Sequence, residues 1–398
     1  MSNHIIASLD IGSSLIKVLV VAPRSEGAGF EVLSKISKPS FGVRRGAIIN
    51  TEKVSEIISQ GLEQAEKESG RQIKEVYVNI NGAHIFSTTS HGTIAVSRAD
   101  QKISQDDIER VIQAAQTFSL PPNREILEVF EKEFIVDGEK GIKQALGMEG
   151  VRLEAEILVL GCFSPYLKNL EKSVLEAGVN IADIEVSPLA SSSAVLTPRE
   201  KELGVLVLEI GAGTTGFCVF NEGNLVYLGI IPIGSSHITN DIAIGLKTDV
   251  DTAERIKLQF GSCDLKGSKK LKIKEQNSQE SLELSQKALG SIIDARISEI
   301  FEQIKKELKK IDLPKLPAGI VLCGGGAKLP KIKEWAKKDF KLPCRLGKPK
   351  SFFPEQDDPQ WACVFGLALK SEELIKTDTS LIPKIFEKAK GILGHFIP

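Results

Sequence analysis

Residues 8–20 read SLDIGSSLIKVLV, and residues 207–220 read VLEIGAGTTGFCVF. Each stretch is an apolar run that ends in a carboxylate, Asp10 or Glu209, followed by a turn of glycine and hydroxyl residues and a second apolar run. Apolar runs broken by a short glycine turn are typical of paired β-strands. The two stretches therefore predict two similar hairpins, one in each half of the chain.

Two such hairpins that face one another have the chemistry to hold a polyphosphate. Backbone N–H groups and hydroxyls of the turns bind phosphate oxygens, and the paired acids hold a hydrated magnesium ion. Either hairpin taken alone is equally well a plain tight turn. The repetition, together with a third glycine cluster at residues 324–326, favours a nucleotide clamp between two similar halves.

The composition is that of an ordinary globular protein. The chain has 398 residues, of which 42% are hydrophobic and 26% charged, and its net charge is −1. This length allows two or three domains, and the absence of a basic excess argues against a nucleic-acid partner. The six cysteines form no CxxC pair, which suits a reducing cytosol. We find no signal peptide and no run of the ~18 apolar residues that a membrane span needs, so we expect the body of the chain in the cytoplasm.

The first half of the chain alternates strands and helices around a segment of different character. We expect a helix at 54–67 and strands at 5–9, 15–22, 30–36 and 76–80. Between residues 84 and 163, Ser104 and Asp107 cap a helix at 105–117, and strands are expected at 126–136 and 151–160. This stretch is predicted to form an inserted α+β subdomain.

The second half is predicted to be mostly helical outside its hairpin. Helices are expected at 166–178, 189–196, 249–260 and 283–310, the last with an apolar face. A polar break is expected at 276–279, a buried strand at 319–323, and a polar linker at 371–380.

The second hairpin contains a literal GxGxxG, at residues 211–216. In a dinucleotide-binding domain this motif opens a helix, so that the pyrophosphate lies at the helix N-terminus. Here it leads into the apolar run 217–220, which predicts a strand, and we reject a Rossmann site. A Walker-type loop is also excluded, because Phe217 stands where its lysine would be.

Two further features have either a nucleotide-binding role or a purely structural one. Gly324, Gly325 and Gly326 let a nucleoside approach the backbone closely, but they also suit a strand-to-helix connection. Glu254 and Lys257 share one helix face and either bracket a ribose or adenine or form a solvated ion pair.

The C-terminal stretch 381–398 has the pattern of an amphipathic helix. Its apolar face, with one flanking lysine, is expected to bind a membrane surface through Ile385, Phe386, Lys388, Ala389, Ile392, Leu393 and Phe396. The alternative is a helix docked on its own domain. A single short helix binds an anionic leaflet weakly, so firm attachment requires several tails acting together.

The chain resembles the actin/Hsp70/sugar-kinase superfamily and, within it, the FtsA family of bacterial division proteins. The segments that carry the resemblance are 8–17, 142–154, 205–220, 231–246, 318–327 and the terminal helix. The resemblance implies an α/β, two-lobed actin-like ATPase fold with an inserted α+β subdomain and a C-terminal amphipathic helix. The implied parts are a first lobe core (1–83, 164–202 and 363–375), the insert (84–163), a second lobe core (203–236 and 313–362), its outer subdomain (237–312), and a linker with the helix (376–398).

The resemblance also implies a ligand and partners. ATP with Mg²⁺ would lie between the two loops. Asp10 and Glu209 would hold the metal ion through water, and they are also the implied catalytic residues. The implied nucleotide-binding residues are Gly12, Ser13, Ser14, Lys17, Gly211, Gly213, Thr214, Thr215, Glu254, Lys257, Gly324, Gly325 and Gly326. The implied partners are the C-terminal peptide of FtsZ, bound at about 237–312, further copies of the chain in a filament, the anionic cytoplasmic membrane, and other divisome proteins at the septum.

Three departures from the family pattern bear on hydrolysis. FtsA proteins usually carry Asp at the positions of Glu209 and Gly216, and Gly-Gly where this chain has Ser235-Ser236. The longer arm of Glu209 moves the point at which a water would be held, and a ~1 Å misplacement can lower a rate about 100-fold. We expect ATP binding to survive and hydrolysis to be slow or absent.

Two other functions are compatible with the same fold. A small-molecule kinase would need a carboxylate to take the acceptor's proton, for which Asp183 and Glu185 are conceivable. An actin-like membrane adaptor of the type IV pilus kind is the second alternative. A kinase has no use for the C-terminal amphipathic stretch, which favours the division scaffold.

Overall fold

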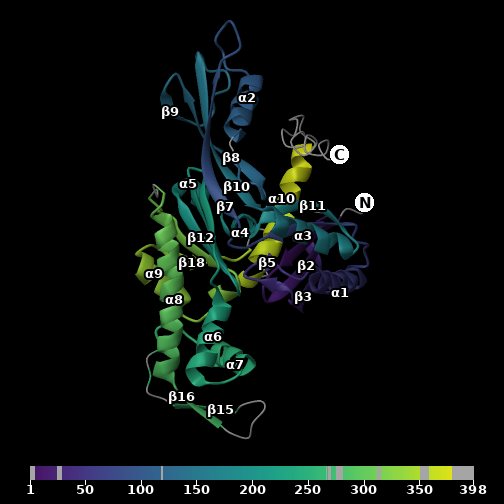
Figure 1. Cartoon of the computed structure of the whole chain (residues 1–398), viewed down its shortest axis with the longest axis vertical. Helices are drawn as coiled ribbons and strands as arrows, with labels where there is room; N and C mark the ends of the chain where they lie inside the picture. The colour runs from purple at the N-terminus through teal and green to yellow at the C-terminus, as the bar shows by residue number, and fades with distance from the viewer. Residues whose placement is uncertain are drawn as a thin grey trace.

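Two five-stranded sheets of matching topology form the body of the molecule (Figure 1). The computed structural model describes residues 5–378 except 25–28, 118–119, 266, 268–269, 275–280, 312–314 and 350–357. The strand orders are β3-β2-β1-β6-β11 in the first sheet and β14-β13-β12-β17-β18 in the second. In each sheet an antiparallel hairpin, β1–β2 or β12–β13, lies beside a parallel strand, β6 or β17. The two halves expected from the hairpins are therefore present.

The first lobe is built around the first hairpin. α1 (Thr51–Ser69) packs on its sheet and begins at Asn50, whose side chain accepts a hydrogen bond from the Lys53 N–H. The other elements of this lobe are β1 (Ile6–Ile11), β2 (Leu15–Pro23), β3 (Phe30–Pro39), β4 (Val43–Arg44), β5 (Ala47–Ile48), β6 (Glu75–Ile80), α3 (Ser164–Glu176) and β11 (Asn180–Val186).

The second lobe repeats this plan and carries an outer subdomain. Its core elements are α5 (Pro198–Leu203), β12 (Val205–Ile210), β13 (Thr215–Asn221), β14 (Asn224–Ile231), β17 (Gly319–Cys323), η1 (Gly325–Lys328), α9 (Ile332–Phe340) and β18 (Cys344–Leu346). The outer subdomain holds α6 (Ser235–Leu246), α7 (Val250–Phe260), β15 (Lys270–Lys274), β16 (Ser281–Ser285) and α8 (Gln286–Leu308). As the apolar spacing of α8 predicts, its residues Leu289, Ile293, Ile297, Ile300, Ile304 and Leu308 are buried.

The inserted subdomain projects from the first lobe, at the top of Figure 1. Its sheet has the order β7-β10-β8-β9 and is covered by α2 (Gln105–Gln116). The predicted capping box is present, with reciprocal hydrogen bonds between Ser104 and Asp107. The strands are β7 (Phe86–Ala95), β8 (Arg124–Val136), β9 (Glu139–Ile142) and β10 (Arg152–Phe163).

Two helices cross between the lobes. α4 (Ser187–Val195) contacts strands of both sheets and packs along α10 (Ala362–Asp378), which follows the short helix η2 (Pro359–Trp361). At the crossing point, a Cβ placed on Gly366 would lie 1.7 Å from the Ala190 carbonyl oxygen. Only glycine allows this approach, so the crossing fixes the distance between the two helices.

Two sequence-based boundaries were wrong. Residues 283–285, assigned to the long helix, belong instead to β16 (Ser281–Ser285), because Ser-Leu-Glu-Leu-Ser alternates with the period of a strand. Residues 371–378, assigned to a polar linker, are helical, since α10 continues to Asp378. The predicted polar break at 276–279 and the predicted C-terminal helix lie outside the described residues. Among the residues that are described, no helix is both long and apolar enough to span a bilayer.

We predict that Gly366→Ala destabilises the chain although alanine favours helices. The added methyl would overlap Ala190 and force α4 and α10 apart, which should lower the free energy of unfolding by about 1–3 kcal/mol. Gly325→Ala is the control, because a Cβ there would meet nothing closer than 3.8 Å. Thermal or urea unfolding measures both variants, and equal stabilities would contradict the close crossing.

Candidate functional site

The two predicted hairpins are closed by the same turn. The Gly12 N–H donates to the Leu15 carbonyl at 3.0 Å, and the Gly211 N–H donates to the Thr214 carbonyl at 2.9 Å. The turns also meet, because a Cβ placed on Gly213 would lie 2.7 Å from the Ser13 Oγ. Two loops from different lobes, far apart in the sequence, therefore face each other as the pattern predicts.

The acid of the first hairpin lies in a buried polar cluster. The Lys17 ammonium donates to the Asp10 Oδ2 at 2.8 Å and to the Gln360 carbonyl at 2.9 Å. The Asn79 Nδ2 donates to the Asp10 Oδ1 at 2.9 Å. Burial alone would lower the pKa of Lys17, but the Asp10 carboxylate outweighs it, so this pKa is raised. Lys17 therefore stays charged and neutralises the Asp10 carboxylate.

The acid of the second hairpin has one oxygen engaged and one free. The Ser191 Oγ donates to the Glu209 Oε1 at 2.8 Å, whereas the Glu209 Oε2 is buried without a hydrogen-bond partner in the described part of the chain. Burial raises the pKa of Glu209 to about 7, and the nearby Asp10 charge adds to this effect. The charge of Asp10 in the first lobe therefore acts on Glu209 in the second.

The departure at Gly216 has a steric counterpart. Gly216 pairs with Glu209 across the hairpin, and a Cβ on Gly216 would lie 2.4 Å from the Pro188 Cγ. Pro188 opens α4, so the helix between the lobes fills the space that a side chain at this position would need. A side chain at position 216 would therefore overlap the start of α4.

The other predicted loop residues differ in what they can offer a ligand. Thr214 is buried, and the Thr215 hydroxyl is committed to the Ile233 carbonyl at 2.8 Å. Ser14 is exposed at the turn. Hydrogen-bonding capacity toward a phosphate therefore comes mainly from Ser13, Ser14 and the backbone of the two turns.

The third glycine cluster is partly explained by packing. Gly324 has a φ of 82°, and a Cβ there would lie 2.5 Å from the Ile210 carbonyl oxygen. A Cβ on Gly326 would lie 2.3 Å from the Ile210 side chain. Gly325 alone is exposed and unobstructed, so it is the member of the cluster that a nucleoside could approach.

Glu254 and Lys257 form an ion pair, but Lys257 is not a solvated surface residue. Its ammonium lies 2.7 Å from the Glu254 Oε2 and 2.9 Å from the Thr239 Oγ1, and its side chain is 10% exposed. The Thr239 hydroxyl in turn donates to Glu254. This network ties α7 to α6.

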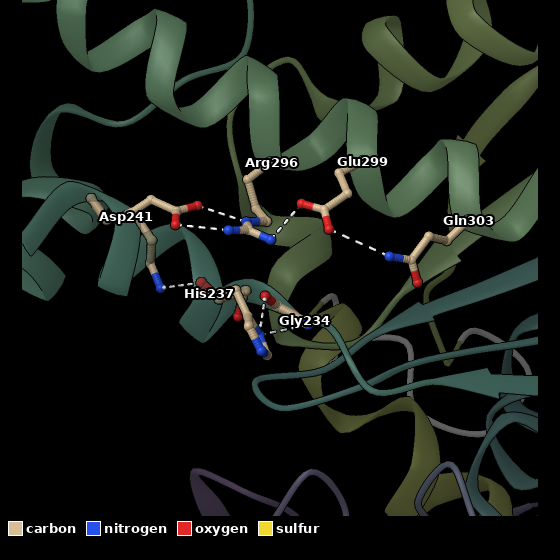
Figure 2. Close-up of polar contacts among 8 residues, drawn as sticks. Gly234, His237, Asp241, Arg296, Glu299 and Gln303 are labelled. Carbon is tan, nitrogen blue, oxygen red and sulfur yellow. Dashed lines mark hydrogen bonds and ion pairs between the residues drawn. The ribbon is translucent and has the colours of Figure 1, made fainter. Parts of the chain in front are cut away.

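The outer subdomain is joined to the second loop through α6. The Ser235 and Ser236 N–H groups donate to the carbonyls of Gly211 and Ala212 at 2.8 and 2.9 Å. Further along α6, Asp241 accepts two hydrogen bonds from the Arg296 guanidinium of α8, at 2.6 and 2.7 Å (Figure 2). The second loop, α6 and α8 are therefore linked by hydrogen bonds.

The donor set fits a hydrated magnesium–nucleotide complex. Magnesium keeps several of its waters and is usually held by one or two carboxylates, and the unpartnered Glu209 Oε2 beside Asp10 offers such a place. Within the described residues there is no cluster of three or more His, Cys, Asp or Glu side chains that would bind a bare metal ion.

Sequence comparison with known proteins gives the family. The model of "Cell division protein FtsA" matches residues 206–366, and that of "SHS2 domain inserted in FTSA" matches residues 82–160. The chain is 37% identical to the FtsA of Borreliella burgdorferi, over 98% of this chain and 96% of the relative. It is 36% identical to the FtsA of Pseudomonas aeruginosa, over 88% and 84% of the two chains. The chain belongs to the FtsA family of cell division proteins.

Solved structures agree on the fold. The chain superposes on a structure titled "PilM-PilN type IV pilus biogenesis complex" with a TM-score of 0.64 at 16% identity, covering 92% of this chain and 98% of that one. MreB 5 of Spiroplasma citri bound to AMPPNP gives a TM-score of 0.59 at 14% identity, over 96% and 100%. This member of the FtsA family therefore has the actin-like fold that its sequence predicted.

Sequence reasoning missed two residues of the site. Asn79 ends a buried strand, where an amide among apolar residues is a usable signal of a polar contact. Ser191 stands in a run of small residues in α4, and nothing in that run distinguishes it from Ser192 or Ser193. Only the crossing of α4 over β12 brings Ser191 to Glu209.

Ser191→Ala and Ser192→Ala form a matched pair of variants. Both serines are fully buried, but Ser192 donates to the Leu189 carbonyl within its own helix, whereas Ser191 holds Glu209. We expect Ser191→Ala to lower the free energy of unfolding by about 1–3 kcal/mol, because Glu209 loses its hydrogen bond. Ser192→Ala should stay within about 0.5 kcal/mol. Urea unfolding measures both, and similar values would contradict the role of Ser191.

Proposed function

We propose that the chain is an ATP-binding, actin-like adaptor that polymerises on the cytoplasmic membrane and tethers FtsZ filaments at the division site. The observation that carries the proposal is the meeting of the two hairpin turns, Ser13 against Gly213, above the neighbouring acids Asp10 and Glu209. Membership of the FtsA family supports the division role.

ATP with Mg²⁺ is the ligand that fits this arrangement. Asp10 and Glu209 would hold the hydrated ion, the turns at Gly12–Ser14 and Gly211–Thr214 would bind phosphate oxygens, and Gly325 would face the nucleoside. Magnesium, when bound, offsets the negative charge of the phosphates. Because Ser13 and Gly213 already touch, the lobes must part to admit a triphosphate. Binding therefore changes the angle between the lobes, which is what a nucleotide-regulated polymer requires.

Hydrolysis is proposed to be slow. Glu209 is held by Ser191 of α4 rather than by the loop, and position 216 carries no acid. Water-positioning groups must be accurately placed to contribute to rate. Nucleotide state would then change by binding and release more than by turnover.

Attachment to the membrane is proposed to rest on the C-terminal helix, residues 381–398. Its apolar face would enter the lipid headgroup region while Lys388 lies near anionic lipid. The chain that leads to it leaves α10, at whose base Gln360 binds Lys17. Polymerisation would bring several such tails to one surface and strengthen their binding.

The outer subdomain is the proposed binding region for the C-terminal peptide of FtsZ. It exposes three large apolar side chains, Ile244 (77%), Leu258 (72%) and Val250 (55%), on α6 and α7. Exposed apolar side chains gathered on one subdomain are typical of a protein-binding surface. The link from this subdomain to the second loop would make peptide binding sensitive to nucleotide.

The kinase alternative meets an obstacle in its proposed base. Glu185 is buried and forms an ion pair with Lys370, which also contacts Glu128 at 3.2 Å and lies 4.0 Å from Asp183. The surrounding carboxylates raise the pKa of Lys370 against the effect of burial, so Lys370 stays charged. Both candidate bases, Asp183 and Glu185, therefore lie beside a positive charge. The pilus-type adaptor shares the fold at 16% identity, whereas the division family is matched across most of the chain.

The membrane proposal predicts co-sedimentation with liposomes that contain anionic lipid. The full chain should pellet, and a chain without residues 381–398 should remain in the supernatant. Leu393→Asp, on the apolar face, should abolish pelleting, whereas His395→Asp, off that face, adds the same charge and should have a small effect. Equal pelleting of the full and shortened chains would defeat this part of the proposal.

The FtsZ proposal predicts binding of the C-terminal FtsZ peptide at roughly micromolar concentration. Ile244→Asp and Leu258→Asp should each weaken binding about tenfold or more, because each places a charge where an apolar contact would be buried. Leu175→Asp, which changes a side chain exposed to 56% on α3, is the control. Fluorescence anisotropy measures all four, and no binding by the unchanged chain would argue strongly against FtsZ tethering.

A further inference from the structure

The short hairpin β4–β5 carries an unusual turn. Arg44 pairs with Ala47, so Arg45 and Gly46 are the two turn residues, with φ values of 50° and 80°. Two positive φ angles are the pattern of a type I′ turn, whose first position is normally Asn, Asp or Gly. Arginine is disfavoured in this left-handed conformation. A disfavoured residue held in place points to a use for its side chain.

The surroundings hold the turn in position. The Gly46 N–H donates to the Ser13 Oγ at 3.0 Å, which ties the turn to the first phosphate loop. A Cβ on Gly46 would lie 2.8 Å from the Gly82 nitrogen, so the turn also rests on the segment after β6. Ala47 and Ile48 are buried at its base. Arg45 is therefore kept where it is by packing and not by its own preference.

Arg45 also reaches the second lobe. Its Cα lies 3.2 Å from the position of a Cβ on Gly213. Burial lowers the pKa of His237 at the start of α6, and the nearby charges of Arg296 and Arg45 lower it further. Arg45 thus stands where the first loop, the second loop and α6 come together.

The guanidinium of Arg45 is available to a ligand. Arg45 is exposed, and within the described part of the chain no ion pair or hydrogen bond engages it. Lys17, the cation within the first hairpin, is already bound to Asp10 and the Gln360 carbonyl. Residues 10–17 and 209–216, which form the two described loops and their acids, contain no Lys or Arg other than Lys17.

We propose that Arg45 binds the outermost phosphate of the nucleotide and bridges the two lobes through it. This inference rests on the proposed ATP-binding function and deepens it. Gly325 follows β17, on one side of β12, whereas α6 follows β14, on the other side. If the nucleoside lies at Gly325, the phosphates run along the second loop toward α6. The outermost phosphate then lies near Arg45. A guanidinium binds phosphate by two parallel hydrogen bonds, which suits this task.

Arg45→Asn is the informative variant. Asparagine suits a left-handed turn position, so the fold should keep or gain stability while the phosphate contact is lost. We expect ATP to bind about tenfold or more weakly and ADP to bind within about twofold of the unchanged chain. The melting temperature without nucleotide should be unchanged or higher. Calorimetric titration of Mg·ATP and Mg·ADP, with thermal unfolding of the free protein, measures these quantities.

Matched variants separate the contact from a general charge effect. Arg44→Asn removes the neighbouring exposed arginine and should leave both affinities within about twofold. Arg45→Lys keeps the charge without the planar fork and should give an intermediate ATP affinity. Arg45→Gly also relieves the turn and replaces Arg45→Asn if that variant does not fold.

The outcomes distinguish the inference from the function on which it rests. If the unchanged chain binds neither nucleotide, the proposed ATP-binding function fails and this inference with it. If it binds ATP and Arg45→Asn binds ATP equally well, only the role of Arg45 is overturned. An equal loss for ATP and ADP, or an equal loss in Arg44→Asn, also overturns it.

Discussion

The crossing of α4 and α10 is the constraint on which the site depends. The closest approach, Gly366 against the Ala190 carbonyl, sets the distance between these helices. Each helix then holds one half of the site. Ser191, the next residue of α4, binds Glu209, and Gln360, just before α10, binds Lys17 and through it Asp10. A shift at the crossing therefore changes both acids together.

The departures from the family pattern form one connected set. The residues concerned are neighbours at the junction of α4 with the second hairpin. They are Glu209, Ser191, Pro188 and Gly216. Pro188 fills the space beside Gly216, while the longer arm of Glu209 reaches Ser191. In this junction the Glu209 carboxylate is anchored to α4, the helix between the lobes.

Much of the fold was predictable because it rests on local patterns. The two hairpins, the Ser104–Asp107 cap and the apolar face of α8 depend on residues close in the sequence, and all are confirmed. The errors at 283–285 and after 371 concern boundaries, where a strand pairs with a neighbouring strand or a helix continues past a polar change in composition. Local periodicity does not record such partners.

The sequence by itself determined that the chain has two similar halves, each with an acid-ended hairpin and a glycine turn, because strand and turn propensities act over a few residues. Only the tertiary structure decided which side chains meet at those turns. Ser191 and Asn79 reach the acids, and Arg45 reaches the second lobe, through contacts between segments far apart in the chain. Such contacts follow from how the sheets and crossing helices pack, and packing is a property of the whole fold.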